Sequence, residues 1–399
     1  MKLRTAILVL VCLVSAWYNA ICFSDAGSIG LKHGLSSDFY ILWSASKAIM
    51  QGVNPYGPEV TEQNQIVYFG ATAKALGSKT EWRFPYPIYA TFPLFPLAFL
   101  DFRTANEIVF WLFAALTALS VGWLRGKWDR TTVLYCALAF STYPVIYALQ
   151  GRQPTVLFFG LAIGAYALLR SGRLVWAGAL AALSAGKPHV ALAVLLPMLI
   201  WTLSRWHERK RFAISSAAFL LGLFITATIA SPGWIPEWFA TIPHYAQYVR
   251  GPLLTLFFGD KIGLAISVLV FLSLIAILWL HRESDLLFQM SGSVTILSLI
   301  IPYEPYNLIV LLIPAVWIED NARRIAETGA VNQIALAAVR IALILSWVIN
   351  IVGALLWHAS PMGRSIAWTL SGAMILPLLG CVVAMMLVQL FFPILGTLA

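Results

Sequence analysis

The sequence predicts an all-α protein that crosses a membrane many times. Of the 399 residues, 60% are hydrophobic and only 11% are charged, whereas a soluble domain carries about 25% charged residues. Long apolar runs recur from one end of the chain to the other, and short segments holding the charges separate them. No stretch has the composition of a separate soluble domain, so we expect residues 1–399 to form a single integral membrane domain.

About twelve apolar segments are candidate transmembrane helices. A spanning helix that stands alone needs about 20 residues, and several of these segments are shorter, which is tolerated inside a packed bundle. The first run follows Lys2 and Arg4 and exceeds the apolar region of a cleaved signal peptide, about 7–15 residues, so we expect it to be retained. The candidate segments are residues 5–23, 104–124, 131–149, 154–169, 174–186, 189–203, 212–230, 262–280, 286–301, 306–318, 334–357 and 366–392.

The basic residues indicate the orientation of these spans. With the N-terminus in the cytoplasm and twelve crossings, the basic loops all fall on the cytoplasmic side, as the positive-inside rule requires. The short loops on the opposite side carry far fewer cations, namely Arg152, Lys187 and Arg364. This asymmetry accounts for the net charge of +9, so no nucleic-acid partner is expected. The basic loops contain Arg125, Lys127, Arg130, Arg170, Arg173, Arg205, Arg209, Lys210, Arg211, Arg282, Arg323 and Arg324.

The segment 84–100 decides whether the count of twelve holds. It contains Pro85, Pro87, Pro93 and Pro96, and proline inside a helix removes a hydrogen bond and clashes with the preceding turn. We therefore expect a re-entrant or surface-lying piece. A complete crossing here would give thirteen spans and invert every later loop.

Two long loops and three polar clusters share the outer side in this arrangement. The loops are residues 24–84 and 231–261, and the clusters are residues 150–154, 186–189 and 302–307. Polar groups at membrane depth are costly and usually line a cavity. We expect a cavity that opens to the outside and is roofed by the two loops.

Residues 36–58 predict an amphipathic helix with an acid at its start. One stripe is apolar, the other contains Ser44, Lys47 and Gln51, and an Asn-Pro-Tyr-Gly-Pro sequence ends the helix. An interfacial helix of this kind suits an enzyme that acts on lipid-linked material. The alternative for Asp38 is a helix cap, because Ser-Ser-Asp before an apolar periodic run is an N-cap signature. The apolar stripe consists of Phe39, Leu42, Trp43, Ile49, Met50 and Val53.

The order of several short motifs resembles glycosyltransferase family 87. Two departures are visible: Arg152 interrupts a Gly-Gln pair that is common in the family, and Asn307 stands where an aspartate is common, with Glu304 as a nearby alternative acid. The matching stretches are Asp38-Phe39-Tyr40, Gly52 to Tyr56, Phe84-Pro85-Tyr86-Pro87, Gly151-Arg152-Gln153, Ala177-Gly178, Gly186-Lys187-Pro188-His189, and Pro302 to Asn307 followed by an apolar run ending at Pro314.

The resemblance implies the type C glycosyltransferase fold and a sugar donor carried on a polyprenyl phosphate. Mannose is the usual sugar, the acceptor is a lipid or a glycan, and transfer occurs with inversion on the extracytoplasmic face of the cytoplasmic (inner) membrane. The reaction needs a base for the acceptor hydroxyl, placed opposite the leaving group, and groups that hold the departing phosphate. Asp38 is the expected base.

The candidate ligands of the donor phosphate are Lys187, His189, Arg152 and Arg83. A lysine in an apolar stretch costs about 2.5–3.5 kcal/mol at the membrane centre, which favours a functional role for Lys187; the alternative is that it reaches back to the interface. His189 is either a second phosphate ligand or a structural histidine. Arg152 is a phosphate ligand or a lipid-headgroup contact, and Arg83 is a ligand or a charge at the water boundary.

The candidates for contact with the sugar or the acceptor are Glu304, Asn307, Tyr306, Gln153 and Tyr86. Glu304 could instead pair with a nearby cation, and the tyrosines could belong to an interfacial aromatic belt. No acidic pair suited to a nucleotide sugar and its metal occurs in a cytoplasmic loop, and no phosphate-binding glycine motif occurs, so neither a metal nor a cofactor is expected. A transporter of lipid-linked sugars and a non-catalytic envelope-assembly subunit remain as alternatives.

Overall fold

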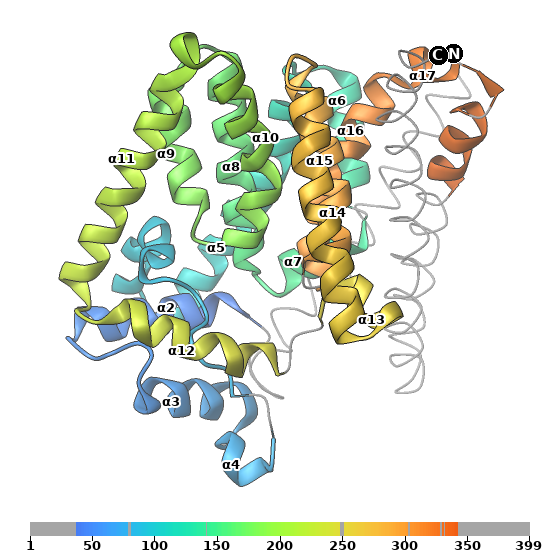
Figure 1. Ribbon diagram of the computed structural model, residues 1–399. Helices are drawn as coiled ribbons and strands as arrows, with labels where there is room; N and C mark the ends of the chain where they lie inside the picture. Colours follow the sequence, from blue (N-terminus) through green and yellow to red (C-terminus); the bar gives the residue numbers. More distant parts are fainter. Residues whose placement is uncertain are drawn as a thin grey trace.

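The computed structural model describes residues 37–78, 81–140, 142–247, 251–301, 304–327, 329–330 and 332–341. Every regular element within these ranges is a helix. Figure 1 shows a bundle of helices, with α2 (Phe39–Met50), α3 (Pro58–Phe69) and α12 (Trp234–Ala246) lying across its lower end. The bundle consists of α5 (Phe102–Arg125), α6 (Arg130–Ala139), α7 (Tyr143–Gln150), α8 (Pro154–Arg170), α9 (Leu174–Ser184), α10 (Pro188–Ser204), α11 (Trp206–Ala230), α14 (Asp260–Leu280), α15 (Leu286–Ile300) and α16 (Leu312–Asp320).

Three of the described helices, α5, α11 and α14, are long and apolar enough to cross a membrane. The bent pair formed by α6 and residues 144–150 adds a fourth candidate if it counts as one span, and five shorter apolar helices of 10–17 residues accompany them. The all-helical membrane class is therefore confirmed, while the count of about twelve spans stays a prediction. The predicted spans 5–23 and 366–392 lie outside the described residues, as do residues 342–357.

The two ends of the bundle differ in charge. Helix α8 begins directly after Gln153 and ends at Arg170, and 17 residues at about 1.5 Å each span about 25 Å. Helix α10 likewise begins after Lys187 and ends next to Arg205, whose guanidinium lies 2.8 Å from Glu283 in the turn between α14 and α15. The basic turns thus lie at the end of the bundle opposite to residues 150–154 and 186–189.

The proline-rich segment forms η1 (Ile88–Phe99), a 3₁₀ helix with Pro93 and Pro96 inside it. Twelve residues of 3₁₀ helix extend about 24 Å at about 2.0 Å per residue. The expectation that these prolines prevent a long regular α-helix is confirmed. Helix η1 packs against α2, and its crossing of the membrane stays a prediction.

Helix α2 lies within the predicted segment but is shorter and more buried than predicted. Its residues Phe39 to Leu42 are all buried, and Ser44, expected on the polar face, is also buried and donates a 2.8 Å hydrogen bond to Asn64 Oδ1 of α3. Met50, expected on the apolar face, is 41% exposed. The predicted stripe thus fails at Ser44 and Met50, because α3 covers part of the polar side of α2 while η1 and α5 pack against the helix; its interfacial position stays a prediction. The helix ends at Met50, before the Asn-Pro-Tyr-Gly-Pro sequence that was predicted to end it, and Gly52 takes the left-handed conformation there with φ of 70°.

Helix α12 connects the two long loops. The Trp238 indole donates to the Pro85 carbonyl at 3.0 Å, and Asn54 Nδ2 donates to Glu237 Oε1 at 2.8 Å. The His244 ring lies 3.3 Å from the Glu81 carboxylate. These contacts bring residues 234–246 onto residues 54–85, as expected for two loops that roof one site.

Gly178 allows α9 to pack closely against α11. A Cβ on Gly178 would lie 2.0 Å from Ser215 Oγ and 2.8 Å from the Phe212 carbonyl oxygen. Small residues let helix backbones approach in this way in membrane proteins. Nothing lies within 4 Å of the corresponding position at Gly222 of α11.

We expect Gly178→Ala to lower the free energy of unfolding by about 1–3 kcal/mol, the usual cost of overpacking, because α9 and α11 must move apart. Gly222→Ala is the matched control and should be neutral or stabilise by about 0.5–1 kcal/mol. Thermal unfolding of the two purified variants in the same detergent measures both effects. Equal melting temperatures for Gly178→Ala and the wild type would contradict the α9–α11 contact.

Candidate functional site

Asp38 is held at the start of α2 by the turn between α7 and α8. The Asp38 amide donates to the Gly151 carbonyl at 2.8 Å, and Gln153 Nε2 donates to Asp38 Oδ2. The carboxylate accepts no hydrogen bond from the first turn of α2, although Asp38 occupies the N-cap position. The capping alternative is therefore wrong, and the acid faces the Gly151–Gln153 turn instead.

The conformation of that turn aims Gln153 at the aspartate. Arg152 has φ of 44°, a left-handed conformation that costs a non-glycine residue about 1–3 kcal/mol. Pro154 opens α8 directly behind it, and the Gln153 amide donates to the Ala148 carbonyl at 2.8 Å. Gln153, expected to contact the sugar or acceptor, thus contacts the expected base.

Lys187 is buried in the turn between α9 and α10, with 2% of its surface exposed. Its ammonium donates to Thr155 Oγ1 and lies 4.8 Å from the centre of the Tyr306 ring. No carboxylate lies within 4 Å of it among the described residues. The alternative in which Lys187 reaches back to the membrane interface is wrong, because the side chain turns inward.

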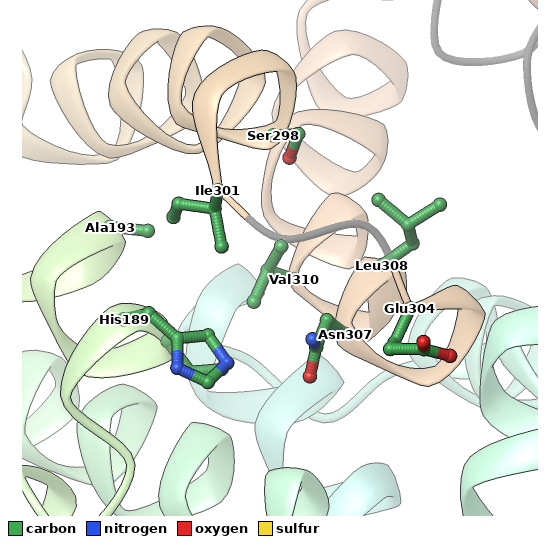
Figure 2. A pocket seen from close by; sticks show the side chains of 9 residues that line it. His189, Ala193, Ser298, Ile301, Glu304, Asn307, Leu308 and Val310 are labelled. Carbon is green, nitrogen blue, oxygen red and sulfur yellow. The ribbon is translucent and has the colours of Figure 1, made fainter. Parts of the chain in front are cut away.

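Thr155 links Lys187 to a second pair of polar residues. Its hydroxyl accepts from Lys187 and donates to Asn307 Oδ1 at 3.1 Å. The Asn307 side chain is in turn hydrogen-bonded to His189, and Figure 2 shows the two side chains facing one another. Sequence reasoning missed Thr155; its one signal was a hydroxyl two residues after Gln153, at the start of an apolar helix.

A small cavity opens beside His189, between α10, α15 and η2 (Pro305–Leu311). Its wall is aliphatic except for His189, Ser298, Glu304 and Asn307 (Figure 2). The His189 Nε2 atom is buried and has no hydrogen-bond partner among the described residues. The cavity therefore has one polar side, next to the Thr155–Asn307 hydrogen bond.

Tyr306 and Tyr245 complete the site from two separate elements. The Tyr306 ring lies 5.9 Å from the ring of Tyr147 on α7, and its hydroxyl interacts with that of Tyr245 on α12. Helix α12 thus reaches the site as well as the loops around it. Tyr245 belongs to the loop 231–261, which was expected to roof the cavity.

The electrostatics of the site depend on burial. Burial raises the pKa of Asp38 to about 7, and the negative charge of Glu304 adds to that effect, while the Gln153 hydrogen bond and the charge of Lys187 oppose it. A carboxyl group with a pKa near neutrality can take up and release a proton at physiological pH. Asp38, Lys187 and Glu304 are thus electrostatically coupled in one site.

Arg152 and Arg83, the two arginines among the expected phosphate ligands, have different surroundings. Arg152 is 4% exposed, its guanidinium lies 5.1 Å from the Phe110 ring, and its Nε has no partner among the described residues. It is thus a buried cation joined to the site through its own turn. Arg83 instead forms an ion pair with Glu81, so the structure does not bring it to Asp38.

Tyr86 contacts two aromatic residues of the first long loop. Its carbonyl accepts a 2.7 Å hydrogen bond from Tyr56, and its ring lies 6.0 Å from Phe84. Of the ten expected site residues, the structure therefore gathers seven around Asp38 and the Lys187 turn. They are Asp38, Gln153, Lys187, His189, Glu304, Tyr306 and Asn307.

This arrangement places a carboxylate of near-neutral pKa beside an ammonium that no carboxylate neutralises directly. Such a pair can accept a proton at one atom while it binds an anion at another. No group of three His, Cys, Asp or Glu side chains within the described ranges could hold a metal ion. The described side chains can thus hold an anion at Lys187 and accept a proton at Asp38.

Three comparisons with known proteins bear on this site. The sequence model of glycosyltransferase family 87 matches residues 84–346, about two thirds of the chain, and covers Gln153, Lys187 and Asn307. No curated protein matches the chain. No solved structure matches it either.

We expect Thr155→Val to lower the free energy of unfolding by about 1.5–3 kcal/mol, because it removes the hydrogen-bond acceptor of a buried ammonium. Thr155→Ser keeps the hydroxyl and should retain most of the stability. Thr226→Val is the control, since Thr226 is exposed and bonds only to Gly222 of its own helix. Thermal unfolding measures all three, and a Thr155→Val protein as stable as Thr226→Val would refute the link.

Proposed function

The chain belongs to glycosyltransferase family 87, and we propose that it transfers a sugar from a polyprenyl phosphate to a lipid or glycan acceptor. The family makes it a membrane-embedded glycosyltransferase that uses a sugar donor and an acceptor. Mannose, the usual sugar of the family, is the proposed sugar. The observation that carries the proposal is the electrostatic coupling of the Asp38 carboxylate to the buried Lys187 ammonium.

The proposed reaction is a single displacement. An acceptor hydroxyl gives its proton to Asp38 while its oxygen bonds to the anomeric carbon. The bond from that carbon to the phosphate oxygen breaks, and the electron pair leaves with the polyprenyl phosphate. Attack from the side opposite to the phosphate inverts the configuration of the anomeric carbon.

Gln153 and Lys187 have separate roles in this scheme. Gln153 occupies Oδ2 of Asp38, which leaves Oδ1 for the acceptor proton and fixes the direction of the carboxylate. Lys187 exchanges its hydrogen bond with Thr155 for one to the phosphate, and the free Nε2 of His189 can donate to the same group. Arg152 adds positive potential from its turn, and Arg83 is left out because Glu81 neutralises it.

The distribution of cations supports an extracytoplasmic site. Helices α8 and α10 begin at the site and end at Arg170 and next to Arg205. Basic turns mark the cytoplasmic side of membrane proteins, so the opposite end, with Asp38, faces outward from the inner membrane. A donor that is embedded in the bilayer reaches this end more readily than a cytoplasmic nucleotide sugar.

We expect purified wild-type protein to release free polyprenyl phosphate from polyprenyl-phosphate mannose when an acceptor is supplied. Asp38→Asn should reduce that rate by about 10²–10⁴-fold, the usual contribution of a general base. The wild-type rate should also rise with pH through about 7, because burial raises the pKa of Asp38 and the base works only when deprotonated. Thin-layer chromatography of the radiolabelled lipid measures the release.

Asp101→Asn is the matched control for this experiment. Asp101 caps α5 through a 3.0 Å hydrogen bond from the Thr104 amide, and asparagine caps a helix about as well as aspartate. Its activity should equal that of the wild type. A wild type that releases no polyprenyl phosphate from any sugar donor, or an Asp38→Asn variant with unchanged activity, would favour a transporter or an assembly subunit instead.

A further inference from the structure

Two strained residues flank the start of α2. Trp82, with φ of 43°, and Arg152, with φ of 44°, are the non-glycine residues with positive φ among those that the structure describes. Arg152 belongs to the turn that holds the Asp38 amide. Trp82 stacks on Tyr68, whose hydroxyl donates to the carbonyl of Ser37, the residue before Asp38. Backbone strain of this kind is found at functional sites, and Arg152 already has a role there.

Trp82 does not belong to the turn that binds Asp38, and contacts with α3 fix its position. Its ring lies 4.5 Å from the Tyr68 ring, nearly parallel to it, and 6.0 Å from Phe69. Gln65 Nε2 donates to the carbonyl of Glu81, the preceding residue, at 2.7 Å. Helix α3 therefore fixes both the backbone and the ring of Trp82. The side chain nevertheless remains only half-buried, so part of the indole stays accessible.

The indole nitrogen of Trp82 has no hydrogen-bond partner within the described part of the chain, although it is buried. Buried tryptophan N–H groups usually find an acceptor. Asn64 Nδ2 and Trp43 Nε1, also in the layer formed by α2 and α3, are buried without partners as well. This layer thus contains several donors that await acceptor oxygens.

The charges near Trp82 favour a neutral ligand. Arg83 is ion-paired with Glu81, and Glu81 also contacts His244. The cations that suit a phosphate are elsewhere around Asp38. Arg152 belongs to the turn that binds the Asp38 amide, and Lys187 is coupled electrostatically to the Asp38 carboxylate. An accessible aromatic ring whose own N–H lacks an acceptor suits a sugar, whose C–H face packs on the ring while a hydroxyl oxygen accepts a hydrogen bond from the indole.

Resting on the transferase function proposed above, we propose that Trp82, backed by Tyr68, binds a sugar ring of the acceptor. The acceptor is then a glycan or a glycolipid rather than a plain lipid alcohol. The Tyr68 hydroxyl ties this surface to Ser37 and so to the position of the base. Trp82 selects the acceptor by its sugar, and Lys187 binds the donor.

Saturation-transfer NMR with methyl α-D-mannoside tests the site on full-length protein in nanodiscs, without any donor. We expect the ring protons of the probe to show transfer from the wild type. Trp82→Leu should weaken the binding about tenfold, the effect of losing one stacking contact and one hydrogen bond. Trp82→Phe keeps a ring without the N–H, so its affinity should lie between the two.

Trp128→Leu is the control, because Trp128 is 59% exposed in the turn between α5 and α6, at the basic end. A second readout separates this site from the transferase function: because no donor is present, Asp38→Asn, which removes the base, should bind the probe as tightly as the wild type. Equal probe binding by Trp82→Leu and Trp128→Leu, or none by the wild type, would overturn the proposal. Probe binding that depends on Trp82, in a protein that releases no polyprenyl phosphate from any donor when an acceptor is supplied, would instead overturn the transferase function alone.

Discussion

The anchoring of Asp38 by the Gly151–Gln153 turn is the contact on which the rest of the site depends. It joins the first long loop to the start of α8 through one backbone and one side-chain hydrogen bond. Because α8 also carries Thr155, the same helix start positions the aspartate and the hydroxyl that holds Lys187. A shift of this turn would therefore displace both Asp38 and Lys187.

The cost of burying charge explains why these residues meet. A lysine and an arginine inside a membrane protein are unfavourable unless polar groups or charges face them. Here Lys187 has one hydroxyl and one aromatic ring, and Arg152 has one carbonyl and one aromatic ring. Both sets of contacts are sparse for buried cations. We take that deficit as the free energy that an anionic substrate recovers when it binds.

The sequence predicted the membrane class, a helix within residues 36–58 and the convergence of most site residues, because charge in an apolar chain is conspicuous. It mispredicted the environment of α2, since periodicity does not show that α3 covers the polar face through Ser44 and Asn64. Thr155 was invisible because one hydroxyl in an apolar run has no pattern. The ion pair of Arg83 with Glu81 was also not foreseen, because Glu81 is only two residues away and belongs to no recognisable motif.

In the proposed mechanism, the buried ammonium of Lys187 and the carboxylate of Asp38 act on one bound lipid phosphate. A cryo-EM structure in nanodiscs with a polyprenyl phosphate would show whether they do. We expect phosphate density about 3 Å from Lys187 Nζ, with Lys187 turned from Thr155 and Asp38 still bonded to Gln153. Phosphate bound instead at the basic turns around Arg205, with Lys187 unchanged, would contradict the proposed mechanism.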